Sequence, residues 1–131
     1  MDAATWRHLN EFLSSRQDAI ANHWRQAVSL TSYSAFDSSQ LQQRFAELTE
    51  QAIGFLLAEP RESARAESLG AALADLNFVQ PEALGKTLQV LSSQLVEGLP
   101  ADCVAALQPG LAALLSSVAI GFCRQDLNRA S

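Results

Sequence analysis

Few side chains in this sequence have the type and spacing that metal binding needs. Its two histidines, His8 and His23, both lie near the start of the chain. Glu11 follows His8 by three residues and shares its helical face, but this pair supplies two ligands where a structural zinc ion takes four. We therefore expect both histidines to be polar surface residues, and we predict no metal site.

The usual arrangements for nucleophilic or acid–base catalysis are also missing. The sequence has no G-x-S-x-G turn, no glycine-rich phosphate loop and no cysteine close to a histidine. Cys123 falls within an apolar helix, where a cysteine is more often a small packed side chain than a reactive thiol. Glu47 and Glu50 lie three apart, opposite an apolar face, which favours two solvated carboxylates. We predict that the chain is not an enzyme and takes no cofactor. A site assembled from separate helices is the alternative left open.

Length and charge limit which other classes of protein this chain can belong to. A chain of 131 residues with 48% apolar residues is expected to form one domain, 1–131, with its own core. Nine basic and fourteen acidic residues give a net charge of −5 without a basic cluster, which argues against nucleic acid and anionic membranes as partners. The N-terminus lacks an apolar signal core, and the two cysteines form no disulfide framework, so we expect a cytoplasmic protein.

The elements that position these side chains are all expected to be helices. Apolar residues recur at helical spacing from Thr5 to Arg129, and no segment alternates with a period of two. Around Ser14-Ser15 the pattern allows one long helix or two; we favour a break, with Ser15 capping the second helix. The sequence predicts an all-α, compact bundle of five to seven helices.

Caps and prolines set the later helix boundaries. Asp37 and Gln40 form a capping-box pattern for a helix that ends near Glu59. The next helix is expected from Pro60 or Ser63 to about Asn77. Pro81 suits the first position of a helix that stops at Gly98-Leu99-Pro100. A short helical turn, 101–107, is then expected to precede a final helix that Pro109 starts.

Aromatic residues are the best lead to a ligand site. They are spread over most of the predicted helices, so an internal cavity would be lined with rings. Plain core packing is the competing interpretation of such spacing. The candidate pocket, with polar groups from the corners, consists of Trp24, Tyr33, Phe45, Phe78 and Gln80.

The last helix carries the strongest pattern. From Gly110 to Cys123 nearly every residue is apolar or small, yet this run is shorter than the roughly 20 residues that a membrane span needs. We therefore expect it to be covered by protein, partly by a second copy of the chain. The sequence predicts a parallel two-fold homodimer on the Pro109–Arg129 helix. The predicted interface consists of Leu111, Leu114, Leu115, Val118 and Phe122.

Three stretches together resemble a known family. They are residues 20–24, the corner 76–85, and 107–111 leading into 119–122. The chain resembles the N-terminal helical sensor domains of bacterial signalling proteins, which precede PAS, GAF and histidine-kinase modules, and it is similar in pattern to the non-haem globin domain of stressosome RsbR-type proteins. The resemblance implies a globin-like bundle, a homodimer and a downstream signalling module. It transfers no site residue, and no histidine after His23 is available as a haem ligand.

These observations favour one function over another. The expected function is a non-catalytic sensory input and dimerisation domain of a cytoplasmic signal-transduction protein, of histidine-kinase or stressosome type. A helix end without a glycine cap after Arg124 suggests a chain that continues into an output module, which would hold any kinase activity. The alternative is a stand-alone helical domain that binds a small molecule.

Overall fold

The computed structural model describes residues 3–30, 37–58, 62–76, 78 and 80–130, and it contains six helices and no strand within them. The all-α prediction is therefore confirmed. The helices are α1 (Ala3–Ser15), α2 (Gln17–Ser29), α3 (Ser38–Leu57), α4 (Ser63–Asp75), α5 (Pro81–Gln94) and α6 (Ala101–Ala130).

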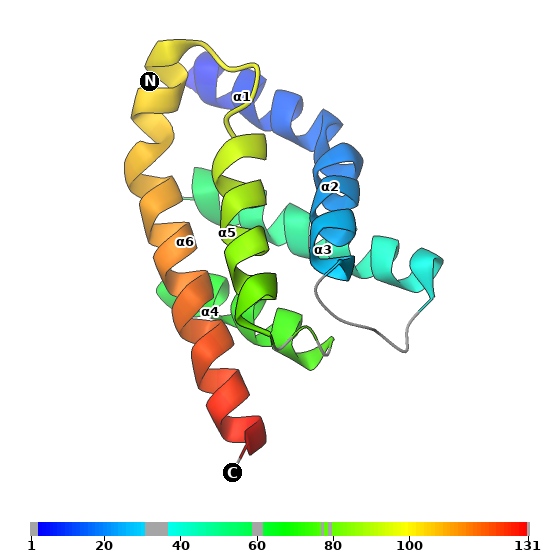
Figure 1. The fold of residues 1–131 in the computed structure, drawn as a ribbon. Helices are drawn as coiled ribbons and strands as arrows, with labels where there is room; N and C mark the ends of the chain where they lie inside the picture. Colours follow the sequence, from blue (N-terminus) through cyan, green and yellow to red (C-terminus); the bar gives the residue numbers. More distant parts are fainter. Residues whose placement is uncertain (1–2, 31–36, 59–61, 77, 79, 131) are drawn as a thin grey trace.

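The helices pack around one core (Figure 1). The long helix α6 runs along one side of the molecule, and its contact with α4 is the most extensive between any two helices described. On the other side, α2 packs against both α3 and α5. Every helix contributes apolar side chains to the shared core, as the helical spacing predicted.

The predicted break between α1 and α2 is present but falls at Arg16, just after the two serines, and Ser15 is not the cap. The Ser15 hydroxyl donates to the backbone oxygen of Phe12 (2.7 Å), and Arg16 occupies the N-cap position without a side-chain capping bond. Instead, Arg16 Nη1 donates to the backbone oxygens of Gln94 (3.1 Å) and Glu97 (2.7 Å). The guanidinium thereby ties the α1–α2 break to the carbonyls at the end of α5.

The capping box at the start of α3 is confirmed. Asp37 Oδ1 accepts from the Gln40 backbone N–H (2.8 Å), and Gln40 Oε1 accepts from the Asp37 backbone N–H (3.1 Å). The helix ends at Leu57, and α4 begins at Ser63, the later of the two predicted starts. Residues 59–61 and Asn77, on which two predicted boundaries fell, lie outside the described residues.

Pro109 does not start the last helix, which corrects the sequence-based boundary. α6 begins at Ala101 and continues through Pro109 without interruption. A proline inside a helix removes one backbone donor and leaves the carbonyl four residues earlier without it. Pro109 and Ala105 are both exposed, so water can satisfy that carbonyl. The predicted short turn and final helix are thus one element of 30 residues.

Two glycines allow α4 and α6 to approach closely. A Cβ atom built on Gly70 would lie 2.0 Å from the backbone oxygen of Val118, and one built on Gly121 would lie 1.7 Å from that of Glu67. Real Cβ atoms never come so near a backbone oxygen, so both positions require glycine. This crossing fixes which side of α6 faces the core.

Candidate functional site

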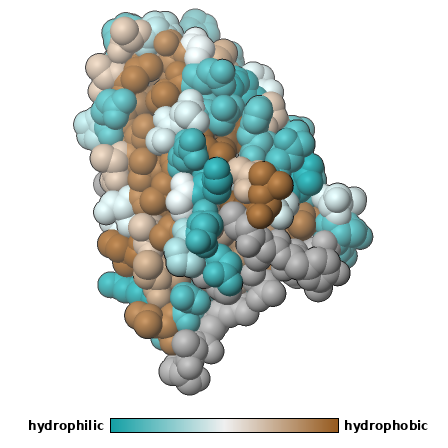
Figure 2. All heavy atoms as spheres, in the orientation of Figure 1, coloured by the Kyte–Doolittle hydropathy of each residue, from teal (hydrophilic) through white to brown (hydrophobic). Residues whose placement is uncertain are grey.

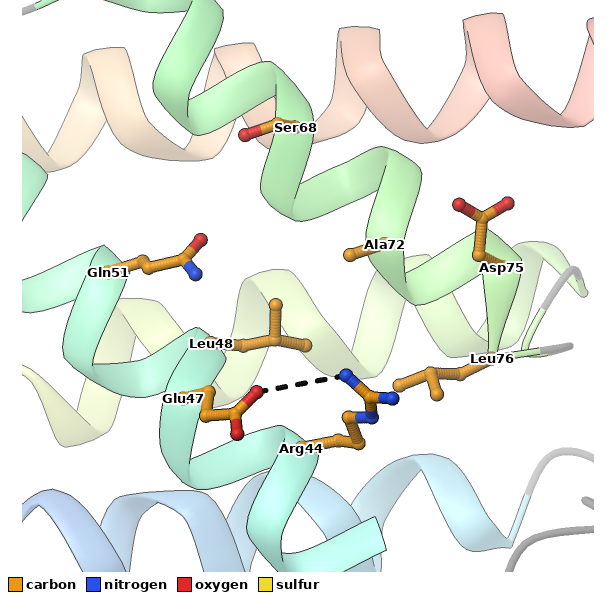
Figure 3. Close-up of a pocket in the computed structure, with 8 residues that line it drawn as sticks. All are labelled: Arg44, Glu47, Leu48, Gln51, Ser68, Ala72, Asp75 and Leu76. Atoms are coloured by element: carbon orange, nitrogen blue, oxygen red, sulfur yellow. Dashed lines mark ion pairs between the residues drawn. The ribbon is translucent and has the colours of Figure 1, made fainter. Parts of the chain in front are cut away.

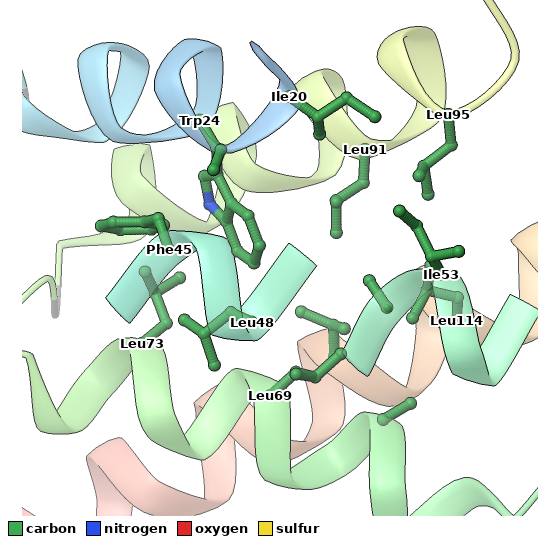
Figure 4. Packing of buried hydrophobic residues seen from close by; sticks show 14 of the residues in the cluster. Ile20, Trp24, Phe45, Leu48, Ile53, Leu69, Leu73, Leu91, Leu95 and Leu114 are labelled. Carbon is green, nitrogen blue, oxygen red and sulfur yellow. The ribbon is translucent and has the colours of Figure 1, made fainter. Parts of the chain in front are cut away.

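The three described aromatics of the predicted pocket belong to the core, and Figure 4 shows two of them, Trp24 and Phe45, next to each other. Trp24, Phe45 and Phe78 are fully buried. The Trp24 and Phe45 rings meet edge to face with centroids 5.1 Å apart, and the Phe45 and Phe78 centroids are 5.9 Å apart. Trp24 Nε1 donates to Thr87 Oγ1 (2.9 Å), which satisfies the one polar atom of this cluster. The rings therefore pack against one another, as the competing core interpretation expected.

The described polar member of the predicted pocket, Gln80, does not join this cluster. Gln80 is exposed and occupies the N-cap position of α5, where its side chain makes no capping bond. Tyr33 lies outside the described residues. A ligand pocket at this position stays a prediction; of its four described members, the structure brings together the three aromatic ones.

A different hollow of about 430 Å³ lies between α3 and α4 (Figure 3). Its floor is apolar, formed by Leu48, Ala72 and Leu76, whereas its rim is polar. On that rim Arg44 pairs with Glu47 at 3.9 Å, and both side chains are at least half exposed. Most ligand sites are enclosed and mainly apolar, so this open hollow with a solvated rim gives the small-molecule alternative little support.

The candidate metal-binding and acid–base groups are dispersed over the described part of the chain. His8 and His23 are both exposed, and the described residues contain no group of three or more histidine, cysteine, aspartate or glutamate side chains placed to hold a metal. Glu47 and Glu50 are exposed on α3, as the solvated interpretation predicted.

The two cysteines have opposite environments. Cys103 is buried, whereas Cys123 is exposed on α6, so the expectation that Cys123 is a packed side chain was wrong. The reason is the Gly121 crossing, which turns Phe122 and Gly121 toward α4 and leaves position 123 on the outside.

Four of the five predicted interface residues lie inside the domain. Leu111, Leu114, Val118 and Phe122 are at most 4% exposed, and they belong to the core. Only Leu115 is partly exposed. All five contribute to the core, and four of them have almost no surface left for a partner. The dimer contact itself stays a prediction.

The surface of α6 is apolar along another face, which we call the outer stripe. It is exposed at every position, and Ile120 and Leu127 are among the large apolar side chains most open to solvent, with 43% and 71% exposure. Figure 2 shows apolar side chains gathering along much of the length of α6, beside a more polar surface. The outer stripe consists of Ala105, Pro109, Ala112, Ser116, Ile120, Cys123 and Leu127.

Sequence reasoning missed the outer stripe although six of its seven residues lie in the predicted Pro109–Arg129 helix. The sequence does not show which side of that helix packs against α4, and this contact decides which residues stay exposed. Placing the helix start at Pro109 also made the apolar helix too short. Helix α6 from Ala101 to Asn128 is in fact long and apolar enough, by length and composition, to cross a membrane, a property that the core helices of soluble proteins also have.

The chain was compared with protein-family models, with curated proteins and with solved structures, and none of them matches it.

Proposed function

We propose that this chain is a non-catalytic sensory input and dimerisation domain of a cytoplasmic signal-transduction protein, of histidine-kinase or stressosome type, and that it acts as a homodimer. The globin-like arrangement and the downstream signalling module belong to the same proposal. The observation that carries it is the outer stripe, an exposed apolar face on α6, the longest helix described.

The remaining surface supports a binding role over catalysis. Among the described residues the titratable side chains are scattered, and the hollow between α3 and α4 is open and rimmed by a solvated ion pair. Large exposed apolar patches on soluble proteins usually mark contacts with another macromolecule. A second copy of the chain is always present at the chain's own concentration, so we take it as the partner.

The dimer is tested by the mass of the purified chain across a tenfold dilution series. We expect the mass of two chains at the highest concentration, which Ile120→Lys should reduce to one, because a charged side chain would be buried in the contact. Leu30→Lys is the matched control, since Leu30 is 87% exposed and lies at the end of α2, away from the outer stripe. It should leave the dimer intact.

A mass of one chain throughout, with a radius of gyration of about 14 Å, would contradict the homodimer. The signalling part has its own test, because it requires an output module in the same reading frame after Ser131. A kinase, PAS or phosphotransfer region there would support the proposal. A reading frame without any such region would contradict it.

A further inference from the structure

The outer stripe has a spacing that reads the same in both directions. Its seven positions are separated by 4, 3, 4, 4, 3 and 4 residues, and Ser116 is the central one. The pattern repeats every eleven residues, about 3.67 per turn, close to the period of a straight helix. The stripe therefore stays on one side of α6, and two antiparallel copies would place every stripe residue opposite another.

Side-chain size changes along the stripe. Its first half is small, with Ala105 and Ala112, whereas its second half carries Ile120 and Leu127. A parallel pair would face small residues with small ones and large with large, so the two helices would splay. An antiparallel pair centred on Ser116 faces each large residue with a small one, which gives the more even packing.

The positions of the charged residues along α6 also favour the antiparallel orientation. Residues 103–123 of α6 contain no charged side chain, so the same patch can meet itself without burying one. The charged residues lie at the ends of the helix. A parallel pair would set Arg124 and Asp126 beside their own copies, and like charges in juxtaposition are unfavourable. In the antiparallel register they lie opposite Gln108 and Ala106 of the second copy.

We propose that the outer stripe binds the same stripe of a second copy in antiparallel orientation, with the two Ser116 residues at the two-fold axis. This inference rests on the proposed homodimer and specifies its interface. It replaces the parallel arrangement that the sequence predicted. In the antiparallel dimer the two C-termini leave at opposite ends of the contact, so an output module would not receive two adjoining helices.

A second copy fits the stripe better than a lipid bilayer does. A membrane span needs an apolar surface around its whole circumference, whereas one side of α6 is locked against α4 by Gly70 and Gly121. Lipid could surround α6 only after the α4–α6 contact had opened. With the α4–α6 contact closed, the outer stripe is a narrow apolar surface, and its width suits one helix of a partner.

Disulfide cross-linking under mild oxidation distinguishes the two orientations. In the antiparallel register the two Cys123 residues are offset by 14 residues, about 21 Å along the helix. A disulfide requires Cα atoms about 4.4–6.8 Å apart, so the wild-type chain should not cross-link. The double variant Ser116→Cys with Cys123→Ser should cross-link efficiently, because position 116 faces itself. Cys123→Ser alone, which leaves the buried Cys103, is the control for background.

Each result decides a separate point. Efficient wild-type cross-linking through Cys123 would overturn the antiparallel orientation in favour of a parallel one. If the protein has the mass of two chains but neither the wild type nor the Ser116→Cys, Cys123→Ser variant cross-links, the dimer contact lies on another face. That result would overturn the proposed interface and leave the proposed homodimer standing. A mass of one chain, together with flotation of the wild-type protein on phosphatidylcholine–phosphatidylglycerol vesicles, would overturn both in favour of a membrane contact.

Discussion

The indole N–H of Trp24 is a buried polar group that needs a hydrogen-bond acceptor inside the core. It is fully buried, and its partner is the Thr87 hydroxyl on α5, 63 residues away. Helical spacing was enough to predict that Trp24 is buried. The partner was not predictable, because Thr87 lies on a different helix and only the packing of α2 against α5 brings the two together.

Replacing Thr87 with Val should destabilise the domain by about 1–3 kcal/mol, because the buried indole N–H then loses its acceptor. Thr49→Val is the matched control. Thr49 is equally buried, but its hydroxyl bonds to the Phe45 carbonyl of its own helix, so its removal leaves no donor unpaired. Urea denaturation of both variants checks this, and equal losses would contradict the role assigned to the Trp24–Thr87 bond.

Helix boundaries were predictable where a cap or a break is local. Asp37 with Gln40 marks the start of α3 by itself, and the serines mark the α1–α2 break. Pro109 shows why local rules fail elsewhere. Buried side chains on both sides of the proline, Leu107 and Leu111, anchor α6 in the core, and the exposure of Pro109 removes much of its cost. Local sequence contains neither fact.

The α4–α6 crossing gives a prediction with built-in controls. Gly121→Ala and Gly70→Ala should each destabilise the domain by about 1–3 kcal/mol or more, because the new methyl group meets backbone atoms that cannot move aside. Gly54→Ala and Gly85→Ala should instead stabilise it by about 0.4–1 kcal/mol, since both glycines are helical and have open space around the added Cβ. Thermal unfolding of the four variants measures the contrast, and a uniform effect would rule out the close crossing.

The Arg16 contact joins two elements that are distant in sequence. Besides the two backbone oxygens, its guanidinium reaches the side chains of Gln94 (3.3 Å) and Glu97 (3.1 Å), and its side chain is 22% exposed. Arg16→Lys should destabilise the domain by about 1–2 kcal/mol, because one ammonium group cannot replace the planar fork. Arg65→Lys, in an exposed pair with Glu62, should change stability by less than about 0.5 kcal/mol. Chemical denaturation of the two variants compares them directly.

At the scale of the whole molecule, four of the five residues that the sequence proposed for a dimer contact are buried, and the exposed apolar face of α6 lies on another side of the helix. Leu114 and Val118 were predictable as core residues, because apolar residues at helical spacing mark a buried face. Which side of α6 remains outside depends on Gly121 and on the partner helix α4, which no local pattern specifies. The same limit applies to the outer stripe, whose residues can be recognised as exposed only when the side of α6 that packs against α4 is known.

A dimer joined through the outer stripe makes thermal stability depend on concentration. Two folded chains bound to each other unfold to two separate chains, so dilution favours unfolding by mass action. A tenfold increase in protein concentration should raise the Tm of the wild-type chain by about 2–4 °C, given the unfolding entropy of a domain of this size.

Ile120→Lys should abolish this dependence while the domain stays folded, because Ile120 is 43% exposed and contributes little to the core. Differential scanning calorimetry at two concentrations checks both proteins, and Leu30→Lys should behave as the wild type does. A wild-type Tm that does not change over a tenfold range in which the mass remains that of one chain would mean that the outer stripe faces solvent, and that α6 serves only the core of a monomer.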